Sequence, residues 1–268
     1  MKTEIRFEGV SYRWVDEEDG SETPVFEGLD LELPRGIVSL VGQNGTGKST
    51  LLALAAGSIL PDSGRVLVRG VDTRDLRDEA SRQRLVSFVF QNMEFETEEP
   101  IGALLSMVHA GGFHAEKKPG LVRDLVEVFG LQAVLGRRTQ ELSKGGLQRA
   151  ILAFSLLYGS PILIMDEPVF AMEEQQKYRA FEYLTSYAAK KGITIYYSAH
   201  ELELTERYSE HMLLFHKDAP PLLGPTPELY VRERIEEAYQ VPITMLKTRE
   251  RLYRKILIER TSRERQAE

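Results

Sequence analysis

The 268-residue sequence contains no cysteine, which excludes disulfide scaffolds, thiolate zinc sites and cysteine nucleophiles together. This absence also fits a reducing compartment. Long apolar runs are missing too: the longest candidate, 150–165, is interrupted by Gly159, Ser160 and Pro161 and is shorter than the roughly 18 residues of a membrane span. The first ten residues, MKTEIRFEGV, lack the apolar stretch of a signal peptide, so we expect no leader.

An excess of basic residues is also absent, because 41 Asp and Glu outnumber 34 Lys and Arg and give a net charge of −7. A general nucleic-acid binder would carry a basic face, so we expect no nucleic-acid partner. Hydrophobic residues at 42% and charged residues at 28% are ordinary globular values, which excludes disordered and fibrous classes. A chain of this length can bury one large core or form two small domains.

Strand-like and helix-like patterns alternate along much of the chain. Strands are expected at 4–7, 29–33, 37–41, 65–68, 85–90, 162–165, 193–198 and 211–215, and a solvated loop at 16–24. Helices are expected at 48–56, partly over 74–84, and at 101–109, 121–129, 145–158, 173–191 and 227–239. This alternation predicts an α/β fold with a mostly parallel sheet and helices on its faces.

The run of helices in mid-chain predicts an inserted α-helical subdomain. We expect 1–92 and 160–225 to form the core with an N-terminal β subdomain, 93–159 the helical subdomain, and 226–268 a C-terminal helix and tail. Residues 247–268 hold eight basic and four acidic residues, which we interpret as a solvated, charged helix or tail.

Residues 42–49, Gly-Gln-Asn-Gly-Thr-Gly-Lys-Ser, match the P-loop pattern G-x-x-x-x-G-K-[ST] between an expected strand and an expected helix. Glycines let backbone N–H groups surround a phosphate, and the following helix adds its dipole. Lys48 supplies a charge for the β- and γ-phosphates, and the Ser49 hydroxyl can bind Mg²⁺. The alternative is a glycine-rich turn that binds nothing. The expected nucleotide-binding residues are Gly42, Gln43, Asn44, Gly45, Thr46, Gly47, Lys48, Ser49 and Thr50.

Residues 162–167, Ile-Leu-Ile-Met-Asp-Glu, predict an apolar strand that ends in two carboxylates. Asp166 is placed to hold Mg²⁺, and Glu167 to polarise an attacking water as general base. The alternative is a plain strand end followed by a turn at Pro168. A P-loop alone does not distinguish a GTPase, a kinase and an ATPase, but small GTPases carry no helical insertion between these two motifs.

With these motifs in this order, the chain resembles the ATP-binding subunits of ABC transporters over most of its length. Five further elements carry the resemblance: the aromatic Trp14, Gln91 at the Q-loop position, 142–149 at the signature position, 170–173 at the D-loop position and His200 at the switch position. The resemblance implies a RecA-like P-loop NTPase core, an antiparallel N-terminal β subdomain and an inserted helical subdomain. It also implies ATP and Mg²⁺ as cofactors and ATP hydrolysis as the activity.

The resemblance also implies roles for individual residues. Trp14 would stack on adenine, with Tyr12 as the alternative ring. Gln91 and His200 would act beside Glu167 in catalysis, at the metal or attacking water and at the γ-phosphate. The implied Mg²⁺ ligands are Ser49, Gln91 and Asp166.

The signature segment would act across a dimer interface. The resemblance implies that Ser143, Lys144, Gly145 and Gly146 complete the ATP site of a second ATPase subunit. Lys144 stands where the family has its first glycine, and Gly146 where it has glutamine. Both a homodimer and a heterodimer with a more regular subunit therefore remain open, as does a regulatory subunit with one weak site.

The implied second partner is an integral-membrane permease, which would hold the chain at the cytoplasmic face of the cell membrane. Residues 222–229 and 232–242 resemble the tail of importer ATPases for iron-siderophore, haem or cobalamin uptake, although a generic cap on the sheet would look similar. The glutamates at 94, 96, 98 and 99 either border the groove that docks the permease or form a solvated loop. Besides a transport ATPase and a regulatory subunit, the third alternative is a soluble ABC ATPase that works without a permease.

Overall fold

The computed structural model describes residues 2–16, 18–114, 120–199, 201–217 and 219–246. The first part of the chain forms an antiparallel sheet. Its strands are ordered β2-β1-β4-β5 and span β1 (Thr3–Val15), β2 (Glu22–Pro34), β4 (Ser63–Val68) and β5 (Val71–Asp72). The loop expected over 16–24 is shorter than predicted, because β2 already begins at Glu22 and pairs with Val15.

A second, mixed sheet has the strand order β10-β9-β3-β8-β7-β6. The parallel strands are β3 (Ile37–Val41), β6 (Val86–Val89), β7 (Ile162–Met165), β8 (Thr194–Ser198) and β9 (His211–Leu214). Strand β10 (Leu222–Pro225), which the sequence pattern did not predict, pairs antiparallel with β9 at one edge. The three central strands are buried along their whole length, as expected for a sheet covered on both faces.

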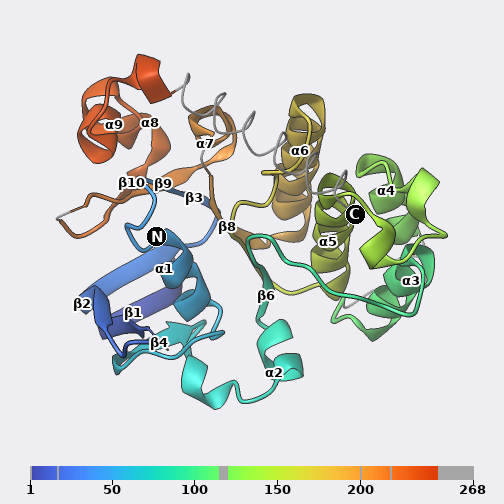
Figure 1. Ribbon diagram of the computed structural model, residues 1–268, viewed down its shortest axis with the longest axis horizontal. Coiled ribbons are helices and arrows are strands. Elements are labelled where there is room, and N and C mark those ends of the chain that lie inside the picture. The colour runs from blue at the N-terminus through green and yellow to red at the C-terminus, as the bar shows by residue number, and fades with distance from the viewer. Residues whose placement is uncertain (1, 17, 115–119, 200, 218, 247–268) are drawn as a thin grey trace.

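Alternate residues of the central strands pack against helices on opposite faces. Ile162 and Ile164 lie in one cluster with the leucines of α1 (Lys48–Ala55), while Leu163 and Met165 pack with α5 (Lys144–Tyr158) and α6 (Glu174–Lys191). Figure 1 shows α1 on one side of the strands and α5 and α6 on the other. The side-chain period of two thus accounts for the continuously apolar strand sequences. The α/β class with a mostly parallel sheet is confirmed.

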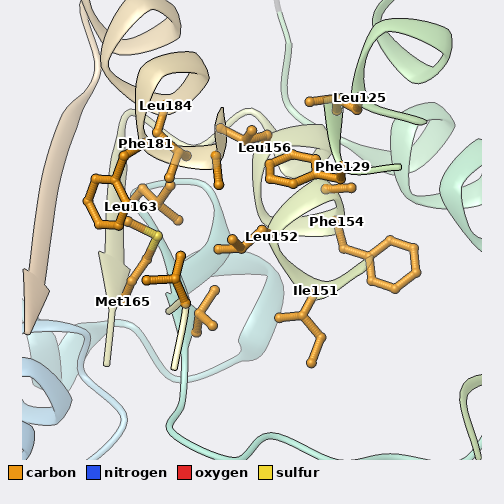
Figure 2. Close-up of a cluster of buried hydrophobic side chains, with 14 of the residues drawn as sticks. Leu125, Phe129, Ile151, Leu152, Phe154, Leu156, Leu163, Met165, Phe181 and Leu184 are labelled. Carbon is orange, nitrogen blue, oxygen red and sulfur yellow. The ribbon is translucent and has the colours of Figure 1, made fainter. Parts of the chain in front are cut away.

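The helices expected in mid-chain are confirmed as α3 (Ile101–Gly111), α4 (Gly120–Val128) and α5. The partly helical segment expected at 74–84 consists of a 3₁₀ turn, η1 (Thr73–Asp75), and α2 (Glu79–Gln83). Two further 3₁₀ turns, η2 (Gln132–Val134) and η3 (Thr139–Glu141), lead towards α5. Figure 2 shows α5 between Leu163 and Phe181 on one side and Leu125 and Phe129 on the other.

The single helix expected over 227–239 is wrong. The structure has α8 (Thr226–Leu229) and α9 (Arg232–Tyr239), with Val231 extended between them. Leu229 and Ile235 are both buried in a cluster on β9, whereas residues six apart on one continuous helix point to different sides. The break therefore buries both side chains.

Helix α7 (Leu202–Tyr208), which the sequence analysis missed, precedes β9. Within the described ranges, no helix has the length and apolar character needed to cross a bilayer. The charged tail expected at 247–268 lies outside the described residues. The boundaries expected between 1–92, 93–159, 160–225 and 226–268 stay a prediction.

Candidate nucleotide-binding site

The loop that joins β3 to α1 is a bare backbone turn. Gly42, Gly45 and Gly47 have φ angles of 150°, 78° and 95°, which L side chains rarely adopt. A Cβ on Gly42 would lie 2.7 Å from the carbonyl oxygen of Phe215, and one on Gly47 would lie 2.9 Å from the ring of Phe26. Both backbone conformation and space therefore require glycine at the two ends of the loop.

Lys48, the first residue of α1, is buried beneath this loop. Its Nζ donates to the carbonyl oxygens of Gly42, at 2.8 Å, and Gln43, at 2.6 Å. Burial lowers the pKa of Lys48 to about 8, although the carboxylates of Glu167 and Asp166 act in the opposite direction. The lysine and the acid pair thus lie close enough to interact electrostatically, as the two sequence motifs predict.

At the start of α1, polar side chains lie beside the aromatic ring of Trp14, which belongs to β1. Ser49 is exposed, while Thr50 is buried and accepts a hydrogen bond of 3.1 Å at its Oγ1 from the Trp14 Nε1. The Trp14 side chain is 48% exposed, and Tyr12 contacts it edge-on at 5.1 Å between ring centroids. Trp14 therefore offers an exposed ring beside the loop, and Tyr12 supports it.

A serine that the sequence analysis missed holds the acid pair. Ser198 ends β8, the strand between β3 and β7; its Oγ donates to Asp166 Oδ1 at 2.5 Å and accepts from the Glu167 N–H at 2.9 Å. Asp166 is buried, and Glu167 adopts a left-handed backbone with φ 49°. The sequence contains one signal for this role: Ser198 is a polar residue at the end of the apolar strand expected at 193–198.

The strand register also places Gln91 at this edge of the sheet. Val89 of β6 pairs with Met165 of β7, so Gln91 and Glu167 leave neighbouring strands side by side. Gln91 is exposed, as a ligand-contacting residue would be. His200 lies outside the described residues, and its role stays a prediction.

The signature segment, 142–149, contains the start of α5, which packs on the face of the sheet opposite α1. Ser143 caps the helix, since its Oγ accepts from the Gly146 N–H at 3.1 Å, and both Ser143 and Lys144 are exposed. A Cβ on Gly145 would lie 2.6 Å from the carbonyl oxygen of Ala171. Gly145 therefore allows the helix to contact the turn that follows Glu167 in the same chain.

Gln148 links these two segments by both ends of its amide. Its Nε2 donates to the Glu167 carbonyl oxygen at 3.0 Å, and its Oε1 accepts from the Ala171 N–H at 2.9 Å. Sequence reasoning missed this contact, because nothing near Gln148 in the chain indicates a partner 19 residues away.

The C-terminal helix α9 touches the P-loop as well. The Gly42 N–H donates to the hydroxyl of Tyr239 at 3.3 Å, and the Gln43 Nε2 donates to the Ala238 carbonyl oxygen at 3.4 Å. The segment 232–242, which resembles the tail of importer ATPases, thus contacts the P-loop, which its motif predicts to bind phosphate.

A glycine loop between a parallel strand and a helix, with a carboxylate pair beside its lysine, defines a P-loop nucleotide-binding protein. The ABC transporter family model matches residues 26–170. The nickel import ATP-binding protein NikO of Rhodobacter capsulatus is 33% identical over 221 residues, covering 78% of this chain and 86% of that protein. The chain therefore belongs to the ABC transporter family, as an ATP-binding subunit whose ATP hydrolysis drives transport.

Solved structures agree with this fold. A dimeric ATP-binding cassette bound to ADP and phosphate superposes with a TM-score of 0.70 at 19% identity, covering 82% of this chain and 98% of that chain. A transporter assigned to the metal-chelate type, in an inward-facing conformation, gives a TM-score of 0.68 at 19% identity with 90% of each chain covered.

Proposed function

We propose that the edge formed by the P-loop, Asp166 and Glu167 binds and hydrolyses Mg-ATP. The observation that carries this proposal is the proximity of the buried Lys48 to both carboxylates, although the two motifs lie far apart in the sequence. The P-loop N–H groups and Lys48 bind the phosphates, and the exposed ring of Trp14 stacks on adenine. Glu167 accepts a proton from the attacking water, and we expect Gln91 and His200 to assist it.

The donor set fits Mg²⁺. The exposed Ser49 hydroxyl and the Asp166 carboxylate, fixed by Ser198, offer hard oxygen ligands. No cluster of three or more His, Cys, Asp or Glu suited to a metal occurs among the residues described, which suits a cation held by few protein ligands and by phosphate. When bound, Mg²⁺ neutralises charge on the β- and γ-phosphates, and Gln91 would be its third protein contact.

The two nucleotide sites are completed in a dimer. Because α1 and α5 pack on opposite faces of the sheet, the exposed Ser143 and Lys144 lie on the other face from the P-loop of their own chain. We infer that Ser143, Lys144, Gly145 and Gly146 close the site of a second subunit, by the N–H groups at the start of α5. The dimeric cassette with the same fold supports this arrangement.

Light scattering and an ATPase assay on Glu167→Gln test the proposed dimer and the proposed role of Glu167 in hydrolysis. The variant should retain ATP, lose hydrolysis and shift from 30.4 kDa to about twice that mass with Mg-ATP. Wild-type protein without nucleotide is the control and should stay monomeric. An ATP-bound monomer would contradict a symmetric dimer and point to a different ATPase partner. Turnover that persists would move the general base away from Glu167.

An apolar groove beside the Q-loop is proposed to dock the permease. A cavity of about 200 Å³ lies between β6 and the helices α3 and α5, lined by Phe88, Met93, Phe95, Leu104, Val108, Ile151, Phe154 and Tyr158. Residues 93–96 alternate, with Met93 and Phe95 inward and Glu94 and Glu96 exposed. An apolar floor with an acidic rim suits a short amphipathic helix with basic ends.

Charge reversal tests this docking surface. Glu96→Lys together with Glu98→Lys should reduce permease-stimulated ATPase about tenfold and leave basal turnover unchanged, because neither glutamate belongs to the motifs that we assign to nucleotide binding or hydrolysis. Glu206→Lys with Glu228→Lys, two exposed positions elsewhere, is the matched control. Equal stimulation in both double variants would contradict docking here. The likeness to NikO and the tail segment 222–242 support import of a metal ion or chelate as the transport direction and cargo.

A further inference from the structure

We propose that a second cavity, remote from the nucleotide edge, binds a small organic anion. The cavity has a volume of about 470 Å³, within the 300–1,000 Å³ typical of small-molecule sites. Leu163 near the start of β7 and Ile193 just before β8 line it. The P-loop and Asp166 follow the other ends of the parallel strands, so the two sites lie at opposite edges of one sheet.

Apart from Tyr187, the titratable side chains in the described lining of this cavity are basic. They are Arg69, His114 and Lys191, and no carboxylate belongs to the described lining. The Arg69 Nε lies 2.9 Å from the buried carboxylate of Glu4, which offsets one of these charges. Lys191, exposed in the last turn of α6, supplies the other. The cavity therefore keeps a net positive charge that favours an anionic ligand.

His114 contributes a hydrogen-bonding group to the same wall. Its Nε2 lies 3.0 Å from the Leu156 carbonyl oxygen, and because a carbonyl only accepts, Nε2 carries the proton. Burial lowers the pKa of His114, which favours the neutral form of the ring. Nδ1 is then the unprotonated ring nitrogen, which is an acceptor for a hydroxyl or amine.

The remaining wall combines Ser155 and Ser160 with an apolar and aromatic part, which is formed by Phe113, Leu156, Pro161, Leu163, Tyr187 and Ile193. A bare inorganic ion would leave this surface unfilled, so the matching ligand has a ring or short aliphatic body that carries a phosphate, sulfonate or carboxylate. Gly159, Ser160 and Pro161, which connect α5 to β7, also line the cavity. An occupant therefore contacts the connection between the signature helix and β7, the strand that leads to Asp166.

Pyridoxal 5′-phosphate is a suitable probe, since it is a single ring with a phosphate and an aldehyde. The aldehyde condenses with a lysine amine with loss of water, and borohydride reduces the resulting imine to a stable amine. Saturating Mg-ATP protects Lys48, which makes the result independent of the proposed nucleotide site. We expect peptide mass spectrometry to show about fivefold or more modification at Lys191 than at the neighbouring exposed Lys190.

Two comparisons separate the parts of the proposal. Pyridoxal, which lacks the phosphate, should modify both lysines alike; equal preference for Lys191 would contradict the anionic requirement. Ile193→Trp, which fills the cavity, should reduce modification of Lys191 to the level at Lys190, provided that circular dichroism shows a folded protein. Equal modification of the two lysines in the wild-type protein by pyridoxal phosphate would overturn the proposal without any variant.

Discussion

Gln148 of the signature helix donates its side-chain amide to the backbone carbonyl of Glu167 at 3.0 Å. A helix that we assign to the partner's nucleotide is thus bonded to the acid that we assign to this subunit's own hydrolysis. The same amide accepts from Ala171, so its two bonds hold both ends of the acidic turn. Movement of α5 would therefore displace Glu167 directly.

The first prediction follows from this amide. Gln148→Leu keeps the volume but removes both hydrogen bonds, so Glu167 loses its fixed position. We expect kcat to fall about tenfold or more while the dissociation constant for ATP changes less than twofold. Steady-state hydrolysis and equilibrium binding measure the two quantities. Gln132→Leu, at an exposed position before α5, is the control, and an equal loss in both variants would show a general effect.

The second prediction concerns the pH dependence of ATP binding. Burial lowers the pKa of Lys48 to about 8 in the nucleotide-free protein, and bound phosphate favours the charged amine. As pH rises through this pKa, binding must bring a proton to Lys48, so affinity falls by up to about tenfold per pH unit above 8. Calorimetry in two buffers of different ionisation enthalpy detects the proton uptake.

Lys48→Arg is the control for this effect, because a guanidinium stays charged throughout the range. ATP binding to this variant should involve no proton uptake at position 48. Uptake of the same size in Lys48→Arg would assign the titration to another group.

The third prediction tests the aromatic ring. Trp14→Ala should weaken ATP binding by about 1–3 kcal/mol, since stacking on the base is lost, while Trp14→Phe should retain most of the affinity. Competition with GTP measures how far the ring selects the base. If Trp14→Ala binds ATP as the wild-type protein does, the ring contacts no adenine.

The fourth prediction concerns stability. The Glu4 carboxylate is 3% exposed and pairs with Arg69. Arg69→Met should lower the free energy of unfolding by about 1–3 kcal/mol, because a buried charge loses its ion-pair partner. The double variant Glu4→Leu with Arg69→Met should recover most of this loss, since no buried charge remains. Urea denaturation measures both, and an unaltered single variant would show that Glu4 is solvated.

The sequence predicted those parts of the fold that local chemistry determines. The glycine spacing of 42–47 and the apolar run at 162–165 each specify a backbone form within a few residues, and both are confirmed. Helical spacing over 227–239 was misleading, because burial of Leu229 and Ile235 on the same strand overrides the local preference.

The contacts that sequence reasoning missed join segments far apart in the chain. Ser198 and Asp166 meet because β7 and β8 are neighbours, and Tyr239 reaches Gly42 because the last helices pack on β9. No motif in the local sequence marks Ser198 or Tyr239 as the partner of Asp166 or Gly42. Only the strand order brings them together, and strand order is a property of the whole fold.

Trp14 is the single tryptophan of the chain, and it stands beside the P-loop with its indole N–H on Thr50. Tryptophan emission from this protein therefore originates at one position, and no labelling dye is needed to observe that position. Nucleotide arrival, the order of subunit closure and product departure should each change the same optical signal. A stopped-flow trace of the unmodified protein would then report the timing of the ATP-binding and hydrolysis cycle at the nucleotide edge.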